Sequence, residues 1–217
     1  MARSFAGGTD RLQWTVPGSL NGTAGCFTFR LKTTQTTTNA APIAYWNTSS
    51  RNGLGFVLNN TANKILAQGY SFSAAQVSIS STSNINDGNW RSVAFNYNQN
   101  SGGANALFID GVQEATVNTG ANWGINANTD ICAGDLLDSF WPSYVGDIAE
   151  IGHWNTQLDA AEIAALANGF SPMLVRPASL IFYAPVVRET RELRAGLAGN
   201  TTGGSVSDHP RKIGPGC

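Results

Sequence analysis

Short runs of β-prone residues alternate with turn signals along most of this chain. Gly, Asn, Ser and Asp cluster between the runs. The runs are residues 27–33, 42–47, 53–59, 76–80, 90–98, 106–111 and 147–154. In the run 90–98, Val93, Phe95 and Tyr97 alternate with polar or small residues, which is typical of a strand with one buried face. The pattern predicts an all-β protein whose strands form a sandwich.

A three-stranded meander is predicted within this series. Residues 90–98 and 106–111 are joined by a Gly-rich loop that permits a reversal of the chain. Asp110-Gly111 is a strong turn signal, and residues 112–117 then supply the next strand.

One helix is predicted, after residue 159. Asp159 is suited to the N-cap, and Glu162 completes a capping box with it. Leu158 and Ile163 have the spacing of a hydrophobic staple, and Gly169 supplies a stop. None of the helix's side chains is suited to catalysis, so its predicted role is structural.

Composition and charge exclude several classes of function. The 217 residues carry 13 Lys and Arg against 14 Asp and Glu, a formal charge of -1, so no global field favours nucleic acid or an anionic membrane. The sequence shows no signal peptide and no apolar run of roughly 20 residues, so we expect a soluble chain. Cys26, Cys132 and Cys217 lack metal-type spacing, and we expect two buried free thiols and one terminal thiol.

Three segments carry a family resemblance. Residues 87–111, DGNWRSVAFNYNQNSGGANALFIDG, resemble the central hairpin of the laminin-G-like and pentraxin-like branch of the concanavalin-A-like jelly rolls. Residues 146–166 resemble the closing strand and helix of that family, and residues 4–14 are similar to its early strand. The resemblance covers most of residues 1–170 and implies a two-sheet antiparallel jelly-roll sandwich with one short helix on the C-terminal side.

Residues 171–217 are predicted to add a strand and a polar, Gly-rich tail to this 1–170 domain. Relatives commonly begin with an apolar-aromatic strand that resembles residues 179–187, whereas this chain starts after that point. We therefore predict that residues 179–187 form a central or near-central strand, paired beside the N-terminal strand around residues 3–6, and so complete the sandwich. The alternatives are an added edge strand or a strand donated to a neighbouring subunit.

Catalysis is not expected. A retaining glycosidase needs two carboxylates about 5 to 5.5 Å apart in one cleft. Asp147 and Glu150 are an odd number of residues apart, which predicts that they point to opposite faces of the strand. His153 is interpreted as a structural histidine, His209 lies in the polar tail, and no nucleophile-elbow motif is present.

No cofactor or metal is expected either. Many relatives of this kind hold calcium near the early and closing strands, with an acidic residue at the position that is Ala149 here. The weak calcium candidates are Asp10, Asp147 and Glu150, and the simpler interpretation makes them solvated acids at strand ends.

Two tryptophans in turn-rich segments are the candidate binding residues. Trp123 and Trp141 are placed to stack on sugar rings or to anchor a protein interface, with Asn122, Asn126 and Asp138 as hydrogen-bonding groups. The alternative is that both rings fold back and cover the end of the sandwich.

Two functions of different classes follow. The first is a non-enzymatic virion protein, in capsid decoration or in a tail or fibre, because signal-free single copies of this jelly roll resemble bacteriophage proteins, as do residues 174–185 and 206–211. Its partners are other virion proteins or further copies of itself, assembled in the host cytoplasm. The alternative is a lectin-like carbohydrate-binding module that contacts surface glycans.

Residues 188–194 are the candidate assembly segment, through Arg188, Arg191 and Arg194. A solvated turn or helix is the simpler interpretation of this segment.

Overall fold

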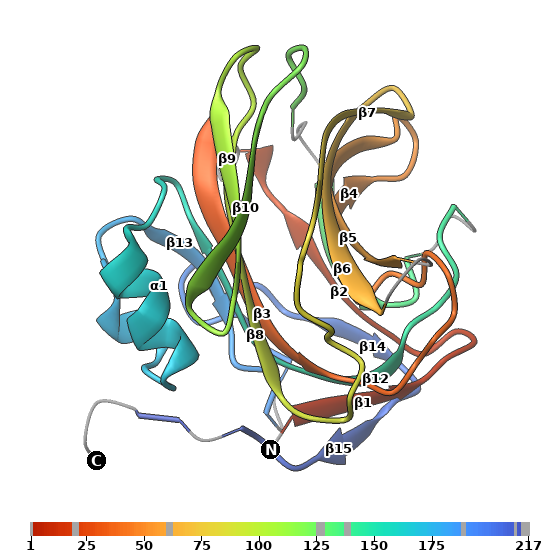
Figure 1. The fold of residues 1–217 in the computed structure, drawn as a ribbon. Helices are drawn as coiled ribbons and strands as arrows, with labels where there is room; N and C mark the ends of the chain where they lie inside the picture. The colour runs from red at the N-terminus through yellow and green to blue at the C-terminus, as the bar shows by residue number, and fades with distance from the viewer. Residues whose placement is uncertain are drawn as a thin grey trace.

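Two antiparallel sheets packed face to face make up the fold, in a computed structural model that describes residues 2–18, 22–59, 63–124, 129–136, 140–187, 190–210 and 212–213 (Figure 1). Sheet A has the order β10 (Val112–Asn118), β9 (Ala104–Ile109), β8 (Arg91–Asn98), β3 (Ala24–Lys32), β12 (Val145–Trp154), β1 (Ala2–Ala6), β15 (Ser205–Ser207), and β13 (Leu180–Ala184) also pairs with β12. Sheet B has the order β14 (Asn200–Thr202), β2 (Arg11–Val16), β11 (Thr129–Gly134), β4 (Ile43–Asn47), β5 (Asn52–Asn59), β6 (Lys64–Ser71), β7 (Ala74–Ser80). The predicted all-β sandwich is confirmed.

The main core lies between the two sheets. Alternate residues of each strand point inward, so Val93, Phe95 and Tyr97 of β8 are all buried in this core. Phe29 of β3 and Phe56 of β5 meet across it in an edge-to-face contact with ring centroids 4.9 Å apart. The predicted meander is also confirmed, because β9 pairs with both β8 and β10.

The single described α-helix is α1 (Ala160–Ala167), and its predicted capping box is present. The Asp159 side chain accepts from the Glu162 N–H, and the Glu162 side chain accepts from the Asp159 N–H. Ile163 and Leu166 pack on the outer face of sheet A, and the short 3-10 helix η2 (Pro172–Leu174) follows. Within the described ranges, no helix is long and apolar enough to cross a membrane.

The segment 4–14 differs from the single early strand that was expected. Gly7 and Gly8 have φ values of 88° and 65°, so the chain turns there and divides into β1 in sheet A and β2 in sheet B. The early segment therefore links the two sheets at one edge of the sandwich.

Segments β13 and β1 share one side of β12, and together we call them the composite strand. Ala184 of β13 pairs with Ile151 of β12, and Arg3 of β1 pairs with Ile148, while β3 pairs along the other side of β12. The Glu150 N–H between these two stretches donates to the carbonyl of Pro185. The segments thus lie end to end along β12, whereas the sequence predicted that they pair with each other.

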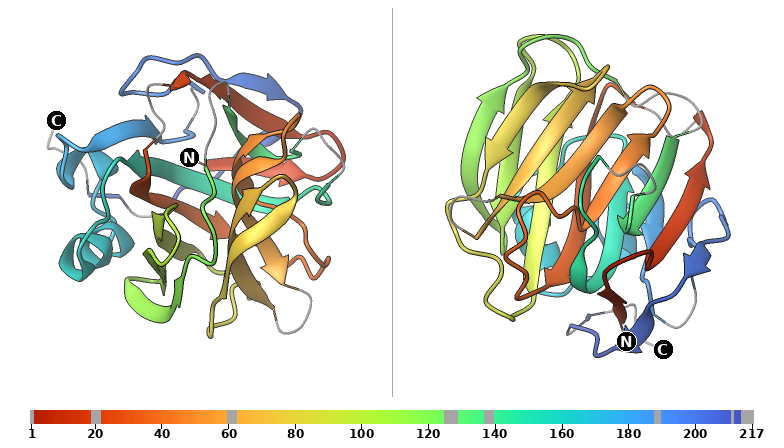
Figure 2. Two further views of the ribbon diagram at one scale, coloured as in Figure 1. Left: turned by 90° about the horizontal axis from the view of Figure 1, so that it is seen from above. Right: turned by 90° about the vertical axis from the view of Figure 1, so that its right-hand side faces the viewer.

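The tail continues this arrangement along the sandwich edge. β14 pairs with β2 at the end of sheet B, and β15 pairs with β1 at the end of sheet A. Figure 2 shows these two blue strands beside the red strands of the N-terminal segment. The tail therefore covers both edges that β1 and β2 would otherwise expose, as edge strands in stable proteins require.

His153 and the two described cysteines are buried. Cys26 is a free thiol and Cys132 is also buried, while Cys217 lies outside the described residues. His153 lies in the core, 2.7 Å from the Tyr97 hydroxyl through Nε2. Burial lowers the pKa of His153 from 6.5 to about 3, so the imidazole is neutral in the folded protein.

We expect this histidine to make the protein acid-sensitive. An unfolded chain binds the proton that folded His153 excludes, so its contribution to stability is complete above pH 6.5 and is lost as pH falls toward 3. The loss approaches about 1.4 kcal/mol per pH unit. Urea unfolding at several pH values between 7.5 and 4 measures it, with His153→Leu as the control. Parallel pH dependences for the two proteins would contradict this expectation.

Candidate functional site

Trp141 belongs to a group of aromatic residues on the outer face of sheet B, which we call the outer aromatic cluster. Its members are Trp46, Tyr70, Phe140 and Trp141. The Trp141 and Trp46 ring centroids are 4.6 Å apart, and only 5% of Trp141 is exposed. Its ring lies over Gly55 of β5, where an added Cβ would come within 2.5 Å of it. Trp141 thus fills the space that a missing side chain leaves on the sheet.

Trp123 occupies the equivalent position on the inner face of sheet B. Its ring lies over Gly69 of β6, contacts Tyr97 with centroids 5.8 Å apart, and is 5% exposed. The exposed Asn122 accepts from the Ser101 N–H at 2.7 Å. Both tryptophans therefore fold back onto the sandwich and offer little ring surface to a ligand. Their predicted partners Asn126 and Asp138 lie outside the described residues.

Two neighbouring turns beside the outer aromatic cluster have strained backbones. Arg51, Phe72 and Ser73 have φ values of 50°, 49° and 68°, in the left-handed region that side chains other than glycine seldom adopt. The turns are bonded to each other, because Ser73 N–H donates to the Arg51 carbonyl at 3.2 Å and Phe72 N–H donates to Asn52 Oδ1 at 2.5 Å. This network holds the two turns in one fixed arrangement.

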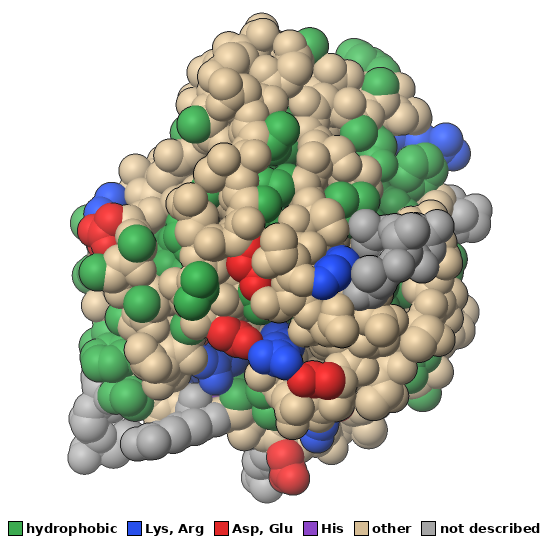
Figure 3. All heavy atoms as spheres, in the orientation of Figure 1, with side chains coloured by type: hydrophobic (Ala, Val, Ile, Leu, Met, Phe, Trp, Pro, Cys, Tyr) green, Lys and Arg blue, Asp and Glu red, His purple; other side chains and the backbone are tan. Residues whose placement is uncertain are grey.

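An exposed aromatic ring and a cation result from that arrangement. Phe72 is 78% exposed, which is the highest value among the described large hydrophobic side chains that reach the surface. The Arg51 guanidinium lies over the ring of the half-buried Phe140, 5.2 Å from its centroid. We call these three residues the aromatic rim. Figure 3 shows hydrophobic side chains beside a basic one over the β4–β5 and β6–β7 turns at the upper right, while most other charged side chains in this view lie across its centre and lower half.

None of the three rim residues was predicted from the sequence. The detectable signal was the segment YSFS, residues 70–73, in which two aromatic residues alternate with serine at the end of a strand. Such a ring in a turn points to solvent, and it can stack on the C–H face of a sugar while a guanidinium donates hydrogen bonds to the sugar's oxygens.

A hollow on the outer face of sheet A has little free hydrogen-bonding capacity. It encloses about 310 Å³ between β8, β9, β10 and the start of α1. Two of its amides are used internally, since Asn96 bonds to the Leu158 backbone and Asn105 bonds to backbone groups and Thr119. The amides mainly stabilise the fold here, so this hollow is a weaker candidate than the aromatic rim.

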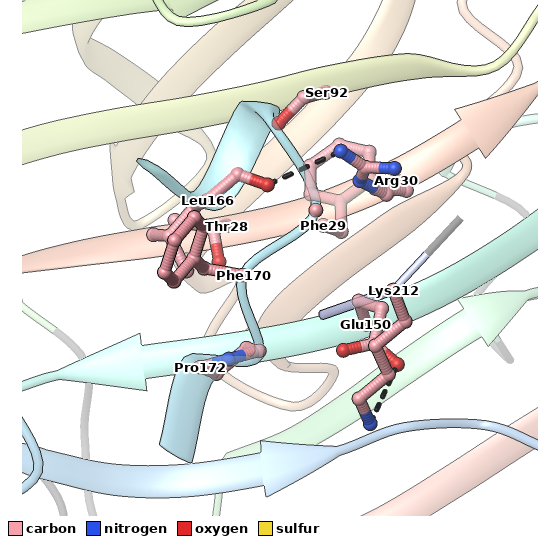
Figure 4. Close-up of a pocket in the computed structure, with 10 residues that line it drawn as sticks. Thr28, Phe29, Arg30, Ser92, Glu150, Leu166, Phe170, Pro172 and Lys212 are labelled. Carbon is pink, nitrogen blue, oxygen red and sulfur yellow. Dashed lines mark hydrogen bonds and ion pairs between the residues drawn. The ribbon is translucent and has the colours of Figure 1, made fainter. Parts of the chain in front are cut away.

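Glu150 is the centre of a buried polar cluster on the outer face of sheet A. Its Oε2 accepts from the Tyr183 hydroxyl at 2.8 Å, and its Oε1 lies 3.0 Å from His209 Nε2 and 3.4 Å from Lys212 Nζ. Burial raises the pKa of Tyr183, so the phenol stays neutral and donates. Figure 4 shows Glu150 and Lys212 beside a pocket of about 20 Å³ under the C-terminal end of α1. The cluster ties the tail to β12.

The prediction that Asp147 and Glu150 point to opposite faces is wrong. A bulge between Ala149 and Gly152 adds a residue to β12, and Glu150 takes a φ of 53° there. Ile148 and Ile151 consequently both point into the core, so the residue preceding each of them points outward. Both carboxylates therefore lie on the outer face.

The calcium candidates do not converge. Asp10 accepts from the Ala6 N–H at 2.9 Å, Asp147 lines a hollow with Lys32, and Glu150 bonds to the tail. No three His, Cys, Asp or Glu side chains within the described part of the chain form a group that suits a metal ion.

The predicted assembly segment is partly folded into the protein. The Arg194 guanidinium donates to the carbonyls of Leu180 and Pro177, at 3.0 Å each. Arg191 is exposed, and Arg188 lies outside the described residues. Glu192, between the last two arginines, is completely buried and anchors this stretch to β13 through the N–H of Tyr183.

Comparisons with known proteins agree with this architecture. Residues 6–164 match the model of a family described as the concanavalin A-like lectin/glucanases superfamily. No curated protein matches the sequence.

Three of the solved structures that resemble the chain are a proposed carbohydrate-binding protein, a pentraxin and an enzyme domain. The first, from Bacteroides ovatus, has a TM-score of 0.72 and 16% identity, over 98% of this chain and 61% of its own. The heptameric SAP-like pentraxin from Limulus polyphemus has a TM-score of 0.61 and 15% identity, over 76% of this chain and 81% of its own. Domain 4 of the extracellular arabinanase AbnA from Geobacillus stearothermophilus was solved in complex with arabinotriose. It has a TM-score of 0.57 and 18% identity, over 70% of this chain and 71% of its own. At these identities the likeness concerns the fold alone.

Proposed function

The chain belongs to the concanavalin A-like lectin/glucanases superfamily, and from this premise we propose that it is a non-enzymatic carbohydrate-binding module. The observation that carries the proposal is the aromatic rim, in which Phe72 is 78% exposed on a strained turn. Carbohydrate binding by proteins of the same fold supports it, since the arabinanase domain was solved with arabinotriose.

Backbone strain at the rim supports a binding role. A left-handed residue other than glycine costs about 1 to 2 kcal/mol, and Arg51, Phe72 and Ser73 all have this conformation. Strain of this kind persists where it positions groups for a ligand. Neither the core nor the sheet pairing gains from a phenyl ring in water at this position, so Phe72 is placed for contact with a partner.

A single substitution at Phe72 separates binding from folding. Phe72→Gly removes the ring and also relieves the left-handed strain, so we expect glycan binding to fall at least tenfold. The free energy of unfolding should stay unchanged or rise by about 1 kcal/mol. Glycan-array binding and isothermal titration calorimetry measure the glycan affinity, and urea unfolding measures the free energy of unfolding.

Val112→Ala is the matched control, because Val112 is also an exposed hydrophobic residue but lies on β10, in the other sheet. Its glycan binding should equal that of the unmodified protein. A protein that binds no glycan on a broad array, or whose binding survives Phe72→Gly unchanged, would overturn the proposed function.

The proposal includes the absence of hydrolysis. The partners of Glu150 come from β13 and the tail of the same chain, so this carboxylate is not free to act on a substrate. Glycan incubated with the protein should be recovered intact.

The virion role stays a prediction. It is compatible with a glycan-binding surface protein, and quantifying this chain in purified particles tests it. Assembly into oligomers is also a proposal, prompted by the heptameric pentraxin.

A further inference from the structure

We propose that the saccharide bound at the aromatic rim carries a negatively charged group, and that Arg51 selects it. This inference rests on the proposed function and adds the class of ligand. It follows from the hydrogen-bonding partners of the arginines, from the position of Arg51 and from the fact that Phe72 and Phe140, the two residues that share the rim with Arg51, are uncharged.

Arg51 differs from most other described arginines in its partner. Arg11, Arg91 and Arg176 form ion pairs with carboxylates, while others donate to backbone carbonyls. The arginines that donate to carbonyls are Arg3, Arg30 and Arg194. Within the described ranges, Arg51 has no carboxylate or carbonyl partner, and its guanidinium contacts the Phe140 ring. Among the described residues, none therefore competes with a ligand for the N–H groups of its guanidinium.

The backbone at Arg51 is also held in place. The main-chain N–H of Arg51 donates to the Asn47 carbonyl at 2.8 Å, and the main-chain carbonyl of Arg51 accepts from the Ser73 N–H at 3.2 Å. The Asn47 side chain in turn accepts from the N–H groups of Ser49 and Ser50 at 3.0 and 2.9 Å. The Phe140 ring supports the planar guanidinium from one side. The turn from which the guanidinium projects is therefore ordered before a ligand binds, which lowers the entropy cost of binding.

The chemistry of such a site favours an acidic sugar. A guanidinium bonds to a carboxylate or sulfate through paired N–H groups, and these charge-assisted bonds are roughly twice as strong as neutral ones. A uronic or sialic acid, or a sulfated hexose, presents an oxyanion beside the C–H groups that stack on an aromatic ring. Phe72 supplies that ring, and Arg51 is the one charged residue of the rim.

Paired glycans test the inference directly. Each acidic glycan is compared with its neutral counterpart: an oligogalacturonate with its methyl ester, a sialylated glycan with its asialo form, and a sulfated galactan oligosaccharide with its desulfated form. We expect at least one acidic glycan to bind about tenfold more tightly than its neutral counterpart, and which pair responds distinguishes carboxylate from sulfate. The preference should shrink as salt rises.

Two variants of Arg51 assign the effect. Arg51→Gln should lower the affinity for the acidic glycan to that of its neutral counterpart, with the neutral affinity unchanged. Arg51→Lys keeps the charge but lacks the paired N–H groups of the guanidinium, so its affinity for the acidic glycan should be intermediate. Equal binding of both members of every pair, or equal losses for both in Arg51→Gln, would overturn the inference and leave the proposed function intact. No binding of any glycan would instead overturn the proposed function.

Discussion

Replacing Phe182 by aspartate is expected to unfold the protein. Phe182 is completely buried at the centre of β13, and its ring packs edge-to-face on Trp14 of β2 with centroids 5.4 Å apart. Loss of a buried phenylalanine alone costs about 3 to 5 kcal/mol, and an unpaired buried carboxylate adds several more. This sum reaches the whole stability of a typical domain.

Circular dichroism and size-exclusion chromatography of Phe182→Asp measure the outcome. Phe72→Asp is the matched control, because it makes the same chemical change at an exposed phenylalanine and should leave the fold intact. A variant at Phe182 that folds as a monomer but no longer assembles would indicate a strand donated between subunits. A cooperatively folded variant with unchanged assembly would show that β13 is dispensable. Either result would contradict the position of β13 in its own sheet.

Glu192→Gln is expected to have the next largest effect. The buried carboxylate accepts four backbone N–H groups: Tyr183 and Arg194 on Oε1, at 2.8 and 2.6 Å, and Ala195 and Gly196 on Oε2, at 2.6 and 3.1 Å. Glutamine replaces one acceptor oxygen with a donor, so two of these N–H groups face another donor. We expect a loss of about 3 kcal/mol in the free energy of unfolding.

Glu114→Gln is the control for this substitution. Glu114 also accepts two backbone N–H groups, from Thr82 and Ser83, but it is half-buried and water can replace its bonds. Its replacement should cost about 1 kcal/mol. Urea unfolding of both variants gives the comparison. Equal losses in the free energy of unfolding would show that the burial of Glu192 does not increase the cost of its replacement.

The strands that sequence analysis found are those with large inward-facing residues. β6 and β11 were missed because their inward positions are partly small: Ala67 and Gly69 in β6, and Ala133 in β11. The space over Gly69 is filled by Trp123 from a distant loop. A local hydrophobic pattern contains no trace of such a contribution, so strands of this kind are not predictable from their own residues.

The candidate site was only partly predictable for related reasons. Trp141 was found, but its ring covers Gly55, and the exposed ring of the region is Phe72. Phe72-Ser73 is not a typical turn sequence, since two left-handed positions normally call for Asn, Asp or Gly. Similarly, alternation along β12 failed at Glu150 because a bulge leaves no signal in the hydrophobic pattern.

The composite strand ties the completion of folding to late stages of synthesis. One side of β12 is paired by residues 2–6 and by residues 180–184, so a nascent chain that has emerged as far as residue 170 still has half of that side unpaired. Open strand edges of this kind favour aggregation, and domains with such distant pairings fold slowly. We therefore expect the partly synthesised protein to stay prone to aggregation until β13 emerges and closes the sheet.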